Sequence, residues 1–105
     1  MLEKIASEFG TPCFVYDFDA VRQRAAAIKA AFGGRFALSY AVKANPNLCI
    51  LRRLQGVVDT LDASSGGELR RAKAAGWSPD LISFTGPGKT DAELQLSVEQ
   101  KIDCV

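Results

Sequence analysis

The sequence predicts an α/β fold in which parallel strands alternate with helices. Apolar runs of strand length alternate with stretches in which apolar residues recur every three or four positions. The segments between successive apolar runs are long enough to hold a helix, as the crossover between parallel strands requires. The composition, 48% hydrophobic and 24% charged residues, is that of an ordinary globular domain without a disorder signal. No apolar run is long enough to predict a transmembrane helix.

The N-terminal part is expected to begin with a helix and a short strand. Apolar residues recur at helical spacing over residues 2–9, and Gly10 follows as a helix stop. Residues 13–16 form an apolar run that predicts a strand, and Asp17 and Asp19 follow it as candidate N-caps of the next helix.

A longer amphipathic helix is predicted next, closed by Gly33-Gly34. Its apolar residues are spaced four, three and four positions apart, which places them on one helical face. These residues are Val21, Ala25, Ile28 and Phe32.

The centre of the chain is predicted to hold two strand–helix units and a further strand. Residues 37–43 predict a buried strand, and the helix after it begins at Asn45-Pro46-Asn47, where a proline in the first turn is favourable. Leucines at positions 48, 51 and 54 share one face of that helix. The elements that follow are a strand over 57–64, a helix over 67–75 and a strand over 81–85.

The segment after residue 88 is compatible with two structures. Apolar residues at 92, 94, 96 and 98 alternate as they do in a strand. Thr90 and Glu93, however, have the spacing of a capping box, and Pro87-Gly88 just before them is typical of a loop. These features favour a helix over the strand. Residues 102–105 then predict the opening of one more strand.

The count of elements predicts a truncated (β/α)8 barrel rather than a complete fold. The chain contains about four strands of the barrel type and one N-terminal strand, whereas a complete barrel takes about 250 residues. The last predicted strand is interrupted at Val105. We therefore expect residues 1–105 to be the N-terminal part of a barrel domain, incomplete as it stands.

Charge and residue usage exclude several classes of function. The net charge of +1 gives no electrostatic reason to expect a nucleic acid or a membrane as partner. The chain has no histidine, and its three cysteines are scattered, so neither a zinc site nor a histidine-dependent triad is expected. The N-terminus lacks the basic region and apolar core of a secretory signal, which favours a cytoplasmic location.

Lys43 is the first candidate for a reactive residue, because it is the last residue of the predicted strand over 37–43. Barrel enzymes place catalytic groups at the carboxyl ends of their strands. Strand alternation puts Lys43 on the same face as Ala37, Ser39 and Ala41, whose small side chains leave room for a bound group. Partial burial of the amine would favour the free base that attacks an aldehyde. The alternative is a lysine whose head simply reaches solvent from the end of a strand.

Two carboxylates lie in and just after the next predicted strand. Val58, Thr60, Asp62 and Ser64 share a largely polar face, which indicates a site rather than a core. Glu68 stands three residues after Ser65, so it is either a helix cap or a second carboxylate near a bound cofactor. The residues leave both interpretations open.

Gly88-Lys89-Thr90 resembles the end of a phosphate-binding loop but does not complete one. The motif requires a glycine at position 83, which is Ser83, and Pro87 removes a backbone N–H donor. We therefore expect a plain turn in which Lys89 faces solvent.

Four stretches in this order resemble the fold-type III pyridoxal phosphate decarboxylases, which act on diaminopimelate, ornithine, arginine and related substrates. The run Tyr40-Ala41-Val42-Lys43-Ala44-Asn45-Pro46-Asn47 is similar to the lysine motif of that family. Gly10-Thr11-Pro12 resembles its N-terminal entry, the run from Asp62 to Leu69 its second motif, and the run from Phe84 to Lys89 its third. The resemblance extends from about Thr11 to Val105.

The resemblance implies a fold and a chemistry. The fold would be part of the (β/α)8 barrel of the alanine racemase-like and ornithine decarboxylase N-terminal type, with residues 11–17 as a strand shared with a missing β-domain. Lys43 would hold pyridoxal 5'-phosphate as an internal aldimine, Ala41 would line the cofactor pocket, and Asp62 and Glu68 would lie close to both. The chain would then belong to a carboxy-lyase that removes the α-carboxylate of a small amino acid.

The family's remaining site residues would lie beyond Val105, and so would those that select the substrate. The full-length form would be a homodimer, and the 105 residues alone would be inactive. An alanine-racemase-like enzyme is one alternative, although Pro46-Asn47 departs from the racemase pattern and favours a decarboxylase. A truncated product without catalysis, acting as a remnant or an interaction module, is the other.

Overall fold

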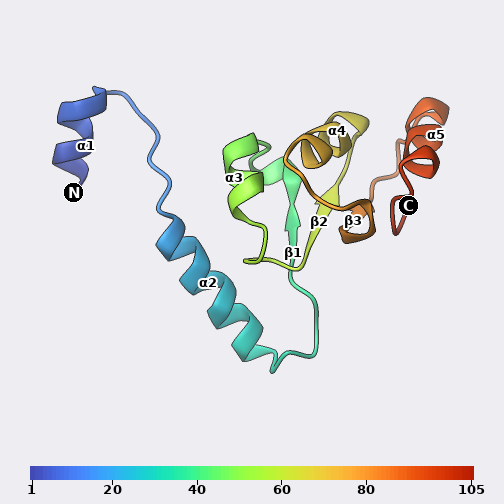
Figure 1. Ribbon diagram of the computed structural model, residues 1–105, viewed down its shortest axis with the longest axis horizontal. Helices are drawn as coiled ribbons and strands as arrows, with labels where there is room; N and C mark the ends of the chain where they lie inside the picture. Colours follow the sequence, from blue (N-terminus) through green and yellow to red (C-terminus); the bar gives the residue numbers. More distant parts are fainter.

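The computed structural model describes Met1–Val105, and Figure 1 follows the chain from the N-terminus to the C-terminus. Two helices come first, and three strands then alternate with three further helices. Their bounds are α1 Leu2–Phe9, α2 Phe18–Ala31, β1 Ser39–Ala41, α3 Leu48–Arg53, β2 Thr60–Ala63, α4 Gly66–Ala74, β3 Ile82–Phe84 and α5 Asp91–Glu99. Short 3-10 helices, η1 (Val42–Ala44) and η2 (Pro79–Leu81), lie directly after β1 and directly before β3. This order confirms the predicted α/β fold.

The strands form one parallel sheet in the order β1-β2-β3. Its register places Ala41 beside Asp62 and Asp62 beside Ser83. Beyond β3, Cys104 forms an isolated parallel bridge with Ser83 and accepts a hydrogen bond from the Phe84 amide at 2.7 Å. The strand opening predicted over 102–105 is therefore confirmed as a single bridge.

The core lies between the sheet and its covering helices. Leu61 and Ala63 of β2 and Phe84 of β3 are buried on the covered face. Helix α4 packs against both strands, and its Leu69 and Ala72 are fully buried. The opposite face carries the half-buried residues Thr60, Asp62 and Ser83. A closed barrel encloses the face turned away from its helices, so this polar face is the one that would line its interior.

Helix α2 contacts the rest of the chain at both ends, and Ala25 near its middle is also buried. Phe18 is buried at the first turn, with the Arg53 guanidinium 5.4 Å from its ring centroid. Near the other end, Lys29 Nζ lies 2.7 Å from Asp59 Oδ1, while Asp59 Oδ2 accepts the Leu38 amide at 2.7 Å. Asp59 therefore joins the end of α2 to the entry into β1.

Capping residues account for most helix boundaries, as predicted. Asp17 accepts hydrogen bonds from two amides of the first turn of α2, whereas Asp19 is inside the helix and pairs with Arg22. Helix α5 begins with a complete Thr90–Glu93 capping box, which confirms a helix there instead of a strand. Helix α3 is capped by Asn47, so Pro46 precedes the helix and the expectation of proline in its first turn is wrong.

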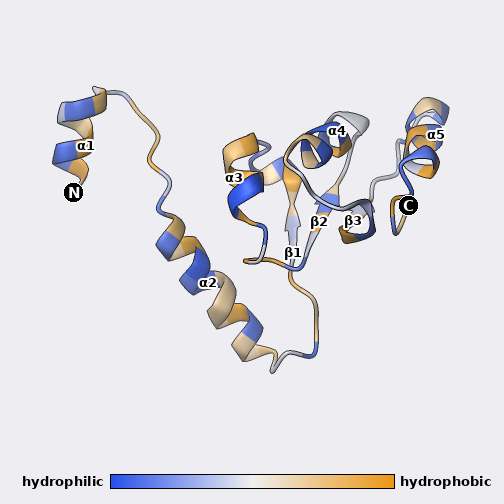
Figure 2. Ribbon diagram, viewed as in Figure 1, coloured by the Kyte–Doolittle hydropathy of each residue, from blue (hydrophilic) through white to orange (hydrophobic).

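The strand predicted over 13–16 is wrong. These residues have no strand hydrogen bonds, and Phe14 is 91% exposed. An isolated apolar segment becomes a strand only when a neighbouring strand pairs with it, and no segment of this chain does so. Figures 1 and 2 show α1 and the apolar linker to α2 lying apart from the sheet. Helix α1 itself has the predicted bounds but contributes no buried residue.

The three strands of the sheet are shorter than the apolar runs predict. The run over 37–43 is a strand only at Ser39–Ala41, and the run over 57–64 only at Thr60–Ala63. Val58, expected on the polar face, is buried in the core before β2 begins. No helix of the structure is long and apolar enough to cross a bilayer.

Candidate functional site

Lys43, Asp62 and Glu68 are brought to one end of the sheet. Lys43 lies in η1, directly after β1, and Asp62 lies in the carboxyl half of β2. Glu68 lies in the first turn of α4, which follows β2 after two residues. Because the strands are parallel, their carboxyl ends share an edge, and η1 contacts both β2 and α4.

Lys43 is presented by a turn and not by the strand itself. The expectation that strand alternation continues from Ala37 to Lys43 is wrong, because β1 ends at Ala41 and η1 begins. Val42 is fully buried and anchors this turn in the core. In a 3-10 turn each residue is rotated by about a third of a circle from the last, so the neighbouring side chain leaves the core. Lys43 is exposed and makes no hydrogen bond or ion pair, which leaves its amine free to react.

Two tyrosines and an asparagine hold the loop after Lys43. Tyr40 donates its hydroxyl to the Asn45 carbonyl at 3.3 Å, and Asn45 Nδ2 donates to the Tyr16 hydroxyl at 3.0 Å. Burial raises the pKa of the Tyr40 phenol above its ordinary value, so it remains a donor at neutral pH. The exposed N-terminal linker is thus tied to the lysine-bearing turn at Tyr16.

Asp62 is fixed by two hydroxyl groups of β3 and its extension. Ser83 Oγ donates to Asp62 Oδ1 at 2.8 Å, and Thr85 Oγ1 donates to Asp62 Oδ2 at 3.1 Å. The Thr85 amide also donates to the Ala63 carbonyl at 2.9 Å. Each carboxylate oxygen therefore has a fixed direction, with further lone pairs left to accept from a bound group.

Glu68 caps the turn between β2 and α4. Its Oε2 accepts the Ser64 amide at 2.8 Å, while Ser65 Oγ accepts the Glu68 amide at 3.2 Å. The capping interpretation of Glu68 is confirmed, with the accepted amide one residue earlier than in a standard capping box. Its other oxygen, Oε1, has no partner, so the cap leaves an acceptor available.

Small side chains stand beside these groups. Ala41 is half-buried and lies beside Asp62 in the sheet register, and Ser39 lies beside Thr60 two residues earlier. No bulky side chain of β1 occupies the polar face at these positions. The side chains that β1 contributes to this face are therefore small.

Lys89 does not face solvent as expected. Its Nζ donates to the Gly86 carbonyl at 2.9 Å and lies 5.0 Å from the centroid of the Phe84 ring. The amine satisfies a carbonyl of its own turn and also lies over a core aromatic ring. Lys89 is therefore engaged in closing the loop after β3.

Ser83, Thr85 and Glu93 were not predicted as part of this region. Ser83 could have been placed beside Asp62 from the period of two in parallel strands, since both lie on the polar face. Glu93 was predicted only as a cap of its own helix, yet its Oε1 also accepts the Gly66 amide at 2.8 Å. Hydrogen bonds from the backbone amides of Thr90 and then Gly66 hold the pKa of the Glu93 carboxyl below its ordinary value.

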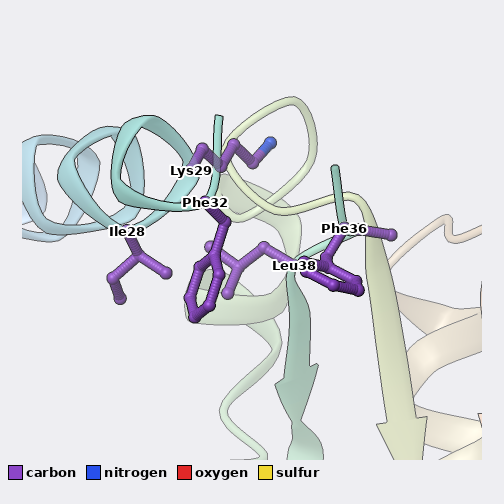
Figure 3. A pocket seen from close by; sticks show the side chains of 6 residues that line it. Ile28, Lys29, Phe32, Phe36 and Leu38 are labelled. Carbon is purple, nitrogen blue, oxygen red and sulfur yellow. The ribbon is translucent and has the colours of Figure 1, made fainter. Parts of the chain in front are cut away.

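An apolar pocket of about 310 Å³ lies away from these groups. Figure 3 shows Phe32 and Phe36 on either side of Leu38, with Ile28 and Lys29 from α2 nearby. Leu38 precedes β1, whereas Lys43 follows it, so the pocket is at the opposite end of the strand. Lys29 is already paired with Asp59, and the pocket therefore offers packing surface and no reactive group.

The fold and the site together define a class. A free lysine and two oriented carboxylates stand at the carboxyl ends of parallel strands, where barrel enzymes carry their active sites. The chain is part of an α/β barrel with reactive groups at this end.

Comparison with known proteins identifies the family. Residues 18–105 match the family described as pyridoxal-dependent decarboxylase, pyridoxal binding domain, and the chain belongs to it. It is 40% identical over 101 residues to a diaminopimelate decarboxylase of Campylobacter jejuni and 36% identical over 104 residues to that of Bacillus subtilis. These alignments cover 95% and 96% of this chain but only 25% and 24% of the relatives.

Solved structures agree with this assignment. The diaminopimelate decarboxylase of Helicobacter pylori, complexed with L-lysine, superposes with a TM-score of 0.86 at 38% identity, covering 98% of this chain and 26% of the other. A lysine/ornithine decarboxylase of Vibrio vulnificus, complexed with putrescine, gives 0.86 at 29% identity, covering 94% and 27%. The chain therefore spans about a quarter of the length of these relatives and corresponds to part of their barrel chains.

Proposed function

We propose that this chain provides the lysine-bearing part of a pyridoxal-phosphate-dependent amino-acid decarboxylase of the diaminopimelate or ornithine type. The observation that carries the proposal is the unpaired amine of Lys43 at the carboxyl end of β1, within the segment that matches the pyridoxal-binding family. The protein would be a carboxy-lyase acting on a small amino acid, as a homodimer in the cytoplasm.

The residues present fit pyridoxal phosphate. Lys43 has an exposed amine without a competing carboxylate, and the small side chain of Ala41 stands beside it on the preceding strand. Asp62 and Glu68 each keep acceptor capacity beyond their own hydrogen bonds. When bound, the cofactor would supply an electron sink for the electron pair left as carbon dioxide departs from an amino acid.

Each proposed site residue has a task that follows from its surroundings. Lys43 would hold the cofactor through its Nζ and exchange a proton at that atom. Asp62, directed by Ser83 and Thr85, would accept a hydrogen bond in a fixed orientation on the polar face. Glu68 would offer Oε1 as a proton acceptor while Oε2 remains on the Ser64 amide. Ala41 would keep the space beside Asp62 open.

Reductive trapping on Lys43 tests the proposal. Protein expressed from the complete reading frame that contains residues 1–105 would be incubated with pyridoxal phosphate, reduced with borohydride and digested for peptide mass spectrometry. We expect a pyridoxyl adduct on Lys43 and none on Lys29 or Lys89, whose amines are paired. Lys43→Arg keeps the charge and should abolish the adduct. An adduct spread evenly over the lysines, or absent from Lys43 in a folded protein, would contradict the proposal.

Sequencing the gene beyond the codon for Val105 distinguishes the enzyme from an inactive product. An open frame that encodes a glycine-rich loop and a histidine supports a decarboxylase. A stop codon at that point would mean that the chain descends from a decarboxylase but is not itself catalytic.

A further inference from the structure

We infer that Glu93 is a positioning residue for the proposed cofactor site, because its carboxylate joins the first turn of α5 to the turn that carries Glu68. The inference rests on the proposed function, since it assigns to a residue of α5 the orientation of groups that would contact the cofactor. Glu93 itself is not expected to touch the cofactor.

One carboxylate serves two helices. Glu93 Oε2 accepts the Thr90 amide and the Thr90 hydroxyl, both at 3.0 Å, and this contact completes the capping box of α5. Glu93 Oε1 accepts the Gly66 amide at 2.8 Å, 27 residues away in the sequence. Gly66 is the first residue of α4, and its N–H is one of the donors that a helix leaves without an internal partner. A capping box needs only the contact with Thr90, so the bond to Gly66 is an additional one.

The backbone of Gly66 is shaped for this contact. A Cβ atom at position 66 would lie 3.1 Å from Glu93 Cγ and 3.3 Å from Glu93 Oε1. Both distances are shorter than ordinary van der Waals contact, so only glycine lets the carboxylate approach without displacement. A side chain at position 66 would therefore push the Glu93 carboxylate away by a few tenths of an ångström.

The turn held in this way contains the proposed site residues. Gly66 lies between Ser65, which caps α4, and Glu68, whose Oε2 accepts the Ser64 amide. Ser64 directly follows β2, which carries Asp62. The loop after β3 closes the same region from its other side, because the Thr85 hydroxyl donates to Asp62. A shift of Gly66 would therefore move the cap that directs Glu68.

The test compares Glu93→Met with Thr90→Ala in the protein expressed from the complete reading frame. Methionine has a similar length and no oxygen acceptor, so Glu93→Met removes the bond from Gly66 as well as the capping box of α5. Thr90→Ala weakens the capping box but leaves the bond from Gly66 to Oε1 in place. We expect Glu93→Met to weaken pyridoxal phosphate binding about tenfold, the effect of losing one charge-assisted hydrogen bond at a site that must be ordered. Thr90→Ala should change that affinity by less than about twofold at a similar loss of thermal stability. Glu99→Met, on the exposed side of α5, is the matched control.

Three readouts separate the outcomes. Cofactor affinity is measured by absorbance titration at a temperature where every variant is folded by circular dichroism, and amide hydrogen exchange reports on residues 64–68. Gly66→Ala, which displaces the carboxylate without removing it, should weaken binding in the same direction. Equal affinity in wild type and Glu93→Met would overturn the inference, and so would an equal loss in Thr90→Ala. If wild type itself forms no adduct on Lys43, the proposed function fails instead, and the inference fails with it.

Discussion

The first prediction concerns the exposed apolar surface of the 105-residue chain by itself. Its accessible surface is 7217 Å², whereas a compact monomer of this size exposes about 5,700 Å². Its radius of gyration is 16.0 Å, against about 13 Å for a compact chain of this length. The difference of about 1,500 Å² is comparable to the total area that a specific protein–protein interface buries.

The exposed aromatic side chains make this surface testable. Phe14, Phe32 and Phe36 are 91%, 55% and 69% exposed, so replacing them with serine removes apolar surface but little packing. Phe84 is 1% exposed, and truncating it should cost about 3–5 kcal/mol. We expect wild type to self-associate and bind a hydrophobic dye, the triple variant Phe14→Ser/Phe32→Ser/Phe36→Ser to do both less, and Phe84→Ser to lose its fold.

Light scattering after size exclusion, small-angle scattering and dye fluorescence provide the measurements. Circular dichroism establishes that the triple variant remains folded. A wild-type monomer with a radius of gyration near 13 Å and no dye binding would refute the reasoning. Association unchanged in the triple variant would also refute it, because the surface that we hold responsible would then play no part.

Three further predictions follow from single contacts. Hydrogen bonds from the Lys29 ammonium and then from the Leu38 amide hold the pKa of Asp59 below its usual 3.8, so the carboxylate stabilises the fold above pH 3.8 and this contribution is lost as the pH falls through the lowered pKa. Asp59→Asn should lower the free energy of unfolding by about 1 kcal/mol at pH 7 and flatten its decrease at acid pH in a series of urea denaturations. An unchanged decrease at acid pH would show that the pair is not coupled to folding. Trp77 donates its indole N–H to the Leu51 carbonyl in the last turn of α3 at 2.8 Å. Trp77→Phe should therefore lower the free energy of unfolding by about 2 kcal/mol, measured by chemical denaturation followed by circular dichroism. A change near zero would mean that water replaces the indole donor. The double variant Ser83→Ala/Thr85→Val leaves Asp62 without its two hydroxyl donors. Cofactor binding should weaken several-fold in absorbance titration, while the adduct still forms on Lys43. Unchanged affinity would show that Asp62 is not part of the proposed site.

Local sequence signals predicted the helices well because α2, α3, α4 and α5 each begin at a capping side chain. Asp17 begins α2 and the pair Thr90 and Glu93 begins α5, and in both cases the side chain satisfies amides that the helix leaves unpaired. The capping box outweighed the strand-like alternation of apolar residues in α5 for the same reason. These contacts involve residues within three positions of one another, so the sequence alone contains them.

The strands and the finer parts of the site depend on partners far away in the sequence. The segment over 13–16 has the composition of a strand but no neighbour to pair with, and the strand before Lys43 ends early because burial of Val42 turns the chain. Lys89 was expected in solvent, yet it bonds to Gly86 and covers Phe84. Glu93 reaches Gly66 across 27 residues. Periodicity predicts which face of an element is apolar but does not predict which groups meet across the fold.

The two ends of the sheet are built differently, and the difference supports the site proposed at the carboxyl end. At that end Asp62 is bonded to Ser83 and Thr85, and Glu68 is bonded to the amide of Ser64. At the other end Asp59 pairs with Lys29 and accepts the Leu38 amide beside an apolar pocket. Orienting a carboxylate with several neutral donors adds little to stability when the group is partly exposed, but it fixes the direction in which the group can act. Such a network is expected where groups must be held ready for a ligand, and it lies at the same end of the sheet as the unpaired amine of Lys43.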